Sequence, residues 1–274
     1  MFATLEPMAV VRSFGAAERQ ARLATRHHLL PSARTDDVVK IATDLIGLHS
    51  TDPVSVYLSA TARMANPSLT AIETALYDHR TLVRHHAMRR TLWVFTPHIA
   101  RLAHASSTAG LLATERRAFL KMLDSAGVPD GDTWIRDARR DLLAALDELC
   151  VATARQLGDA LPALKVPLTL SAGKAYEGTQ SAHTRVLLLL GFEGTVVRAR
   201  PTGTWINGQY RWTAMDTWLP RWRRRGGPGR GCGRAGRPVA AGVRTGYEHR
   251  SAVVDGMDRR GDGEGTRASQ SGAG

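Results

Sequence analysis

The last 54 residues of this 274-residue chain limit its fold most, because they lack the side chains that build a core. From Arg221 to Gly274 the sequence holds 14 Gly and 12 Arg, and no Leu, Ile, Phe or Lys. Such a segment cannot bury enough apolar surface to offset the entropy lost on ordering. We therefore expect a disordered Gly/Arg-rich tail at 221–274. The first 220 residues are long enough for one large or two ordinary domains.

The net charge of +12 also divides unevenly along the chain. The tail carries 12 Arg against five acidic residues, which leaves +5 for the first 220 residues. A mildly basic body fits a polyanionic partner such as nucleic acid. The same charge is typical of a solvated surface in a protein from a GC-rich genome, so charge alone does not identify the partner.

Several classes of protein are excluded by what the sequence lacks. The N-terminus has no signal-like apolar run, and the longest aliphatic stretch, Val186 to Leu190, is too short to span a bilayer. GCGRAG at 231–236 has no strand before it and no helix after it, which argues against a nucleotide site. We predict a cytoplasmic protein with no membrane partner, no metal and no small-molecule cofactor. The oligomeric state is left open.

The first half of the body alternates helical and strand patterns. A helix ending near Gly47 is indicated by an apolar stripe with helical spacing at Val38, Ile41, Ala42, Leu45 and Ile46. Further helices are expected at 16–30, at 54–64, and from the N-cap Ser68 to Tyr77. Strand-forming residues at 81–83 and 91–95 then flank a basic, histidine-rich centre.

The second half shows the same order of predicted helices followed by two strands, with clearer sequence patterns. A helical stripe at 142–149 precedes a short helix capped by Thr153, and a third helix runs from Ser181 to Leu190. Strands are expected at 195–200 and 209–215. The fold class predicted is mainly α with small β-hairpins: tandem winged helix-turn-helix domains at 16–130 and 131–220, followed by the tail at 221–274.

One loop, HSTDP at 49–53, has residues suited to catalysis. A histidine side chain can serve as a general base, so His49, with Thr51 and Asp52 nearby, could position or deprotonate a water molecule. The alternative is structural: Thr51 or Asp52 caps the next helix and His49 is a satisfied polar residue.

A second group of candidates is basic and lies on the two predicted hairpins and the third helix of the second half. Guanidinium groups on rigid strands can hold phosphates, and one on a recognition helix can reach a groove. The alternative is that these are solvated strand faces with the tryptophans in the core. The predicted DNA-contacting residues are Arg84, Arg89, Arg90, Arg185, Arg198 and Arg200.

Four stretches together resemble a known family. They are RHHLLPSA, LIGLHSTDPVSVYLSATARM, LVRHHAMRRTLWVF and LLLLGFEGTVVRARPTGTWINGQYRWTAMDTWLP. The resemblance as a whole extends over most of residues 16–220. They are similar to the winged-helix proteins related to the bacterial alkylpurine DNA glycosylases AlkZ and YcaQ. The resemblance implies tandem winged helices that form a concave, basic surface for double-stranded DNA.

The resemblance also bears on catalysis. In the active glycosylases, a Gln-x-Gln or Gln-x-Asp motif at this loop is associated with hydrolysis of the bond between an alkylated purine and its sugar. His49 and Thr51 occupy those two positions here, so the motif is absent and catalysis stays open. The expected function is DNA binding related to glycosylase activity. The alternatives are a winged-helix transcriptional regulator without enzymatic activity and a nonfunctional truncated product.

The tail departs from the resemblance as well. Relatives continue past the WLP element with a segment like RWLRAFGPGT…DLRWWTGWT. Read one base forward, the possible codons from Pro238 to Arg259 can encode that segment, and Met257 followed by Asp258 forces a Trp. We therefore predict a frameshift near residue 221 that truncates the protein. The alternative is a genuine basic tail that adds nonspecific affinity for nucleic acid. Resequencing codons 215–260 distinguishes the two.

Overall fold

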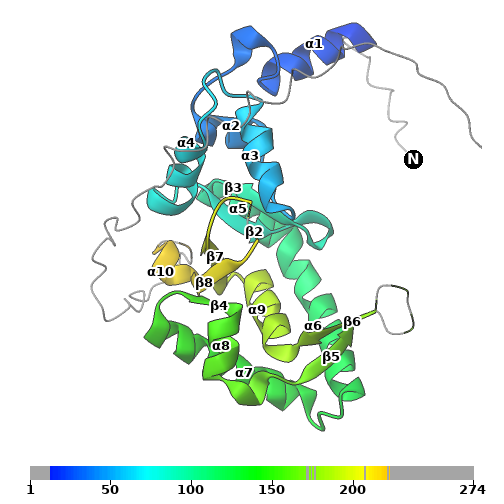
Figure 1. The fold of residues 1–274 in the computed structure, drawn as a ribbon. Helices are drawn as coiled ribbons and strands as arrows, with labels where there is room; N and C mark the ends of the chain where they lie inside the picture. Colours follow the sequence, from blue (N-terminus) through cyan, green and yellow to red (C-terminus); the bar gives the residue numbers. More distant parts are fainter. Residues whose placement is uncertain are drawn as a thin grey trace, which may run out of the picture. The chain divides into compact units, whose positions relative to one another are not determined.

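The computed structural model describes residues 13–170, 173, 175, 177–206, 208–220 and 222. These residues belong to one compact unit that is mainly helical with small antiparallel sheets, as predicted (Figure 1). The predicted tail and its proposed frameshift lie outside the described residues, except for Trp222. No described helix is long and apolar enough to cross a membrane.

The first half contains short helices and one three-stranded sheet. Its elements are α1 (Ala16–Arg26), η1 (Pro31–Ala33), α2 (Val38–Asp44), β1 (Leu48–His49), α3 (Pro53–Thr61), α4 (Leu69–Glu73), η2 (Thr74–Asp78), β2 (Val83–His86), η3 (Met88–Arg90) and β3 (Leu92–Phe95). Side-chain caps set the helix starts, because Asp37 accepts a bond from Lys40 N and Ser68 accepts one from Ala71 N. The helix expected at 16–30 ends at Arg26, since His28 takes a positive φ of 57°.

The second half is longer and more helical. Its elements are α5 (Pro97–Ala103), η4 (His104–Thr108), α6 (Ala109–Ser125), α7 (Gly131–Leu149), β4 (Ala152–Thr153), α8 (Ala154–Ala160), η5 (Pro162–Leu164), β5 (Pro167–Leu170), β6 (Gly178–Ser181), α9 (Ala182–Phe192), β7 (Val196–Pro201), β8 (Tyr210–Ala214) and α10 (Met215–Trp218). A reciprocal capping box between Thr153 and Gln156 begins α8.

The two three-stranded sheets share one topology. Their strand orders are β1-β3-β2 and β4-β8-β7, so in each the short first strand pairs with the last strand of the hairpin. His49 lies opposite Trp93 in the first sheet, and Thr153 lies opposite Arg211 in the second. Helices lie between the first strand and the hairpin in each half: α3, α4 and η2 in the first half, and α8, η5 and α9, together with the hairpin β5–β6, in the second. The described chain therefore contains an internal structural repeat.

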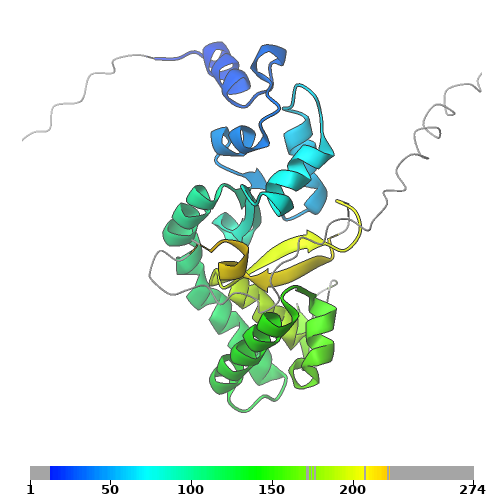
Figure 2. The ribbon, with the colours of Figure 1, turned by 90° about the vertical axis from the view of Figure 1, so that its left-hand side faces the viewer.

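The hairpin β7–β8 connects two hydrophobic cores. Successive residues of a strand point to opposite faces, and Val196 accordingly joins the core built around α7 and α9, whereas Val197 and Ala199 join the core of the first half. Figure 2 shows this hairpin between the cyan and green parts of the ribbon. Met215 and Trp218, which follow β8, also pack into the first core. Both halves consequently depend on the same hairpin.

Candidate functional site

The HSTDP loop begins at a close contact between backbone and an aromatic ring. The chain leaves α2 through Ile46, which has a φ of 66°, and passes Phe95 at Gly47. A Cβ atom at Gly47 would lie 2.5 Å from Phe95 Cε1, so only glycine lets the chain enter β1 here. The pairing of β1 with β3 continues past His49, because Ser50 N donates to Leu92 O at 2.8 Å. The loop is therefore held to the sheet.

Strand alternation turns His49 and Thr51 to the solvent side. Leu48 and Ser50 are buried, whereas His49 and Thr51 are exposed. His49 Nε2 lies 3.2 Å from Thr51 Oγ1, which also accepts a bond from Leu92 N at 3.3 Å. The imidazole packs edge-on against Trp93, with ring centroids 5.2 Å apart. The structure thus brings these two predicted residues together, with the imidazole held by a hydroxyl and a ring.

Asp52 has a helix-capping contact. Its carboxylate accepts bonds from Val54 N at 3.1 Å and from Ser55 Oγ at 3.4 Å, and Pro53 occupies the first position of α3. The capping role that the sequence offered as the alternative is therefore confirmed for Asp52. Its carboxylate remains exposed beside the two outward-facing residues.

Arg84 lies inside the protein, behind the loop. Its side chain donates from Nε to Ser50 Oγ at 3.0 Å and from Nη1 to Tyr77 OH at 2.6 Å, and the residue is 3% exposed. A buried guanidinium cannot reach a backbone phosphate at the surface. The structure therefore gives Arg84 a different place from the one predicted: it ties the catalytic-candidate loop to η2 and presents no donor to solvent.

The two predicted arginines of β7 have different surroundings. Arg198 is partly buried between aromatic rings, 5.4 Å from the Tyr210 centroid and 5.2 Å from the Trp212 centroid. Burial lowers the pKa of its guanidinium. Arg200 reaches back to the first half, where it pairs with Glu73 at 2.7 Å and with Asp78 at 3.0 Å. Arg200 thus contributes an ion-pair bridge between the halves.

The turn of the first hairpin projects two arginines. Arg89 and Arg90 have φ values of 55° and 62°, a left-handed conformation that non-glycine residues adopt at a cost. Both residues are exposed, as is Met88 beside them. Arg90 also donates to Glu115 Oε1 of α6 at 3.1 Å, with most of its side chain still in solvent. Of the six predicted contacts, these two are the most accessible.

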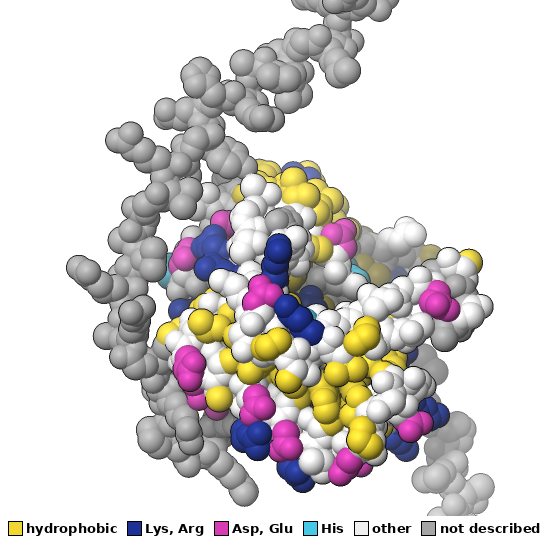
Figure 3. All heavy atoms as spheres, turned by 60° about the horizontal axis from the view of Figure 1, so that its bottom comes forward, with side chains coloured by type: hydrophobic (Ala, Val, Ile, Leu, Met, Phe, Trp, Pro, Cys, Tyr) yellow, Lys and Arg dark blue, Asp and Glu magenta, His cyan; other side chains and the backbone are white. Residues whose placement is uncertain are grey.

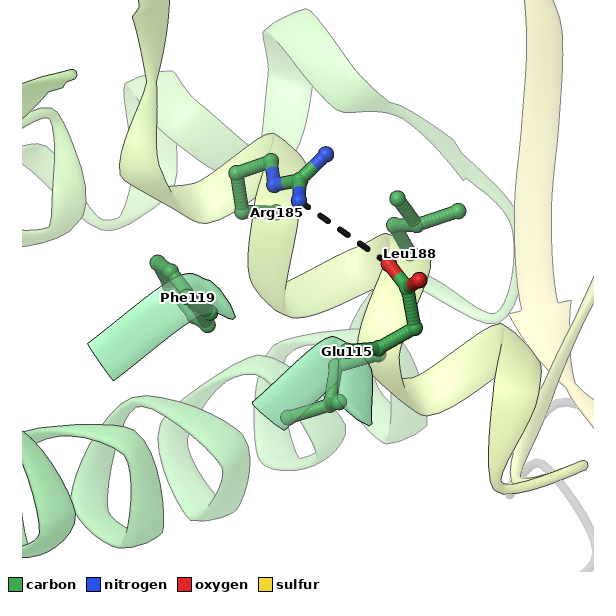
Figure 4. A pocket seen from close by; sticks show the side chains of 5 residues that line it. Glu115, Phe119, Arg185 and Leu188 are labelled. Carbon is green, nitrogen blue, oxygen red and sulfur yellow. Dashed lines mark ion pairs between the residues drawn. The ribbon is translucent and has the colours of Figure 1, made fainter. Parts of the chain in front are cut away.

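Arg185 lies on α9, the helix that the sequence predicted to be a recognition helix, but its side chain is mostly buried. Figure 4 shows its guanidinium on α9 pointing toward Glu115 on α6, with a separation of 4.0 Å. The side chain is 17% exposed and lines a hollow of only about 10 Å³ with Phe119. Most residues of α9 are buried against α6, α7 and α8. In this structure α9 is a core helix, and Arg185 stabilises a buried carboxylate.

A larger hollow opens next to the HSTDP loop, and the sequence did not identify it as a site. It measures about 330 Å³ and is lined by Thr153, Ala154, Arg155, Arg198, Gly208, Gln209, Tyr210 and Trp212. A Cβ atom on Gly208 would lie 3.4 Å from Pro53 Cγ, and the charge of Asp52 acts on the Tyr210 hydroxyl. Two aromatic residues of this wall, Tyr210 and Trp212, alternate with Arg211 along the chain, and this pattern is the sequence signal that could have pointed to it.

Charge is mixed on the face drawn in Figure 3. Lys and Arg side chains lie there among Asp and Glu side chains and form no continuous patch. Ion pairs on α7 illustrate this pattern, since Arg140 contacts both Asp137 and Asp141. Among the described residues, no group of three His, Cys, Asp or Glu side chains could hold a metal ion.

Comparison with known proteins gives the family. Residues 42–250 match the family model described as DNA glycosylase AlkZ-like, and the chain belongs to this family. Among solved structures, the chain is similar to the Streptomyces sahachiroi DNA glycosylase AlkZ, with 16% sequence identity and a TM-score of 0.48. The match covers 73% of this chain and 49% of that one, so the chain spans about half of that protein's length. No curated protein matched the sequence. The resemblance stated from the sequence is thereby confirmed at the level of the family.

Proposed function

We propose that this protein binds double-stranded DNA and hydrolyses the N-glycosidic bond of alkylated purines at the HSTDP loop. Membership of the AlkZ-like DNA glycosylase family supports the class of reaction. The observation that carries the site is the exposed pair of His49 Nε2 and Thr51 Oγ1, 3.2 Å apart, with His49 on β1, which pairs with β3, and Thr51 in the loop that follows β1. A rigid strand supports the constant geometry that general-base catalysis requires.

The loop needs only to activate a water molecule and stabilise positive charge on the sugar, because an alkylated purine is already a good leaving group. Neutral His49 accepts a proton from a water molecule, whose oxygen bonds to the anomeric carbon of the sugar. The C–N bond breaks, and its electron pair leaves with the purine, which becomes neutral. Thr51 orients the imidazole and the water. The exposed carboxylate of Asp52 favours the positive charge that develops on the sugar.

The proposed DNA contacts are chosen by the solvent exposure of the arginine side chains. We propose that the chain contains two winged-helix modules, at 16–130 and 131–220, and that their hairpin turns meet the DNA backbone. The shared strand order of the two sheets supports this assignment. Arg89 and Arg90 are the proposed phosphate contacts because their side chains lie in solvent. We leave Arg84 and Arg185 out of the contact set, since buried polar partners already hold them.

The test is release of free base from a duplex that carries an N-methylated purine. We expect the wild-type chain to release base and His49→Ala to reduce the rate by about 10²- to 10⁴-fold, the range of a positioned general base. Duplex binding should stay within a few-fold. Loss of binding together with activity would point to a structural role for His49, and full activity in His49→Ala would overturn the proposal.

A second variant tests the loop against the family pattern. His49→Gln combined with Thr51→Asp installs the Gln-x-Asp motif associated with active members. We expect this double variant to release base at least as fast as wild type, because the strand holds either pair of side chains in the same place. An inactive double variant that still folds and binds DNA would argue that the loop is not the site of hydrolysis.

A noncatalytic DNA-binding protein is the second candidate function. One observation favours it: Asp52, the acidic residue of the loop, already accepts two bonds at the start of α3. A winged-helix regulator predicts a preferred duplex sequence bound about 10³-fold or more above nonspecific DNA, and no base release. Selection of duplexes from a random pool, followed by a binding titration, separates this function from the proposed hydrolysis.

A further inference from the structure

Two arginines are packed against the same tyrosine beside the 330 Å³ hollow. The guanidinium carbons of Arg84 and Arg198 lie 4.9 and 5.4 Å from the centroid of the Tyr210 ring. Within the described part of the chain, Arg84 Nη2, Arg198 Nε and Tyr210 OH are buried and have no hydrogen-bond partner. Native proteins satisfy nearly all buried polar atoms, so three unsatisfied atoms around one ring need an explanation.

The charge of this cluster is also unbalanced. Among the described residues, neither Arg84 nor Arg198 forms an ion pair with a carboxylate. The neighbours that act most strongly on the pKa of Arg84 are Tyr77, Tyr210 and Tyr57, and the carboxylate whose charge acts on Tyr210 is Asp52 of the HSTDP loop. Arg198 is influenced by Tyr210 and by the like charge of Arg84. Buried charges are normally paired, because burial without a counter-ion is costly. The site therefore favours a negatively charged ligand.

The 330 Å³ hollow gives such a ligand access to Arg198 from the surface. Arg198 lines it together with Arg155, which is exposed at the start of α8. None of the described residues that line it is acidic, and Gln209 and Thr153 add polar atoms to the wall. A cationic alkylated purine would be repelled by two guanidinium groups, whereas a phosphoryl group would be attracted by both.

We infer that this hollow binds a phosphoryl group, held by Arg155 and Arg198, with Arg84 and Tyr210 supporting Arg198 from behind. The phosphoryl group belongs either to the DNA backbone or to free phosphate. The DNA source rests on the proposed function. Because Pro53 adjoins Gly208 at the rim, a backbone phosphate in the hollow would bring a neighbouring nucleotide to the HSTDP loop.

The first arm of the test uses inorganic phosphate and the full chain. Wild type should broaden the ³¹P resonance of phosphate and melt at a higher temperature in phosphate than in sodium chloride of equal ionic strength. Arg155→Gln should weaken the apparent phosphate affinity about tenfold or more, since it removes one charge-assisted contact. Arg140→Gln is the matched control, because it removes one exposed arginine charge on α7, and we expect it to behave as wild type.

The second arm uses an undamaged duplex over a range of salt concentrations. Arg155→Gln should reduce the slope of log K against log salt by about one, the change expected for one lost phosphate contact. Arg140→Gln should leave the slope unchanged. A thermal melt of each variant in chloride checks that the fold is intact.

The outcomes separate the inference from the proposed function. Phosphate binding that depends on Arg155, without any duplex binding, supports a site for free phosphate and counts against the DNA function. Duplex binding with an unaltered salt slope in Arg155→Gln, and no phosphate binding, overturns the inference while leaving the DNA function in place. Dependence of both arms on Arg155 supports the DNA backbone as the source.

Discussion

At the scale of a single residue, the tightest constraint on the candidate site is Gly47. A Cβ atom there would lie 2.5 Å from Phe95 Cε1, and Phe95 is 1% exposed and cannot move into solvent. We expect Gly47→Ala to lower the free energy of unfolding by about 1–3 kcal/mol, as overpacked core sites do. Gly110→Ala is the control, since nothing lies within 4 Å and alanine favours a helix by about 1 kcal/mol. Urea unfolding measures both. Equal changes in the free energy of unfolding for the two variants would contradict the explanation that a side chain at residue 47 clashes with Phe95.

At the scale of an element, β2 is unusual because all four of its residues are buried although three are polar. Burial lowers the pKa of His85 and His86 to about 3, helped by His104 beside His85 and by Arg198 beside His86. An unfolded histidine titrates near 6.5, so the unfolded chain binds more protons as the pH falls. Stability from both residues is complete above that value and is lost as the pH drops from 6.5 toward 3.

The pH dependence can be assigned with one variant. We expect the free energy of unfolding to fall between pH 6.5 and 4.5, and His86→Phe to reduce that slope by about one proton, because phenylalanine keeps the stacking on Phe192, where the rings are now 4.4 Å apart. His98→Gln, at an exposed histidine, should reproduce wild type. Urea unfolding at several pH values gives the slopes, and an unchanged slope in His86→Phe would contradict the assignment.

The helices and hairpins also show what could and could not be predicted from the sequence. Apolar stripes and caps predicted α2, α4 and α9, and strand-forming residues predicted the hairpins β2–β3 and β7–β8, because local periodicity reports which face a segment buries. The sequence did not place α5, α6 or the hairpin β5–β6. Only three residues of α6 are buried, and one of them is Glu115, so its stripe is weak. Local sequence also does not predict whether an arginine side chain points to solvent or into the protein. Arg84 and Arg185 are buried by residues distant in sequence, such as Ser50 and Glu115.

At the scale of the whole molecule, the two cores should unfold together, and Trp222 tests this. The ring centroids of Trp222 and of His85 in the first half lie 5.2 Å apart, and a Cβ atom on Gly194 of the second half would lie 3.1 Å from the indole nitrogen of Trp222. We expect Trp222→Ala to cost about 3–5 kcal/mol, the usual loss for a buried aromatic residue. Hydrogen exchange in denaturant should show peptides of β1–β3 and of α7–α9 shifting to the same lower midpoint. Leu58→Ala, at an exposed leucine, should shift neither. If only the β1–β3 peptides moved, the shared hairpin would not couple the halves, and each would be an independent module.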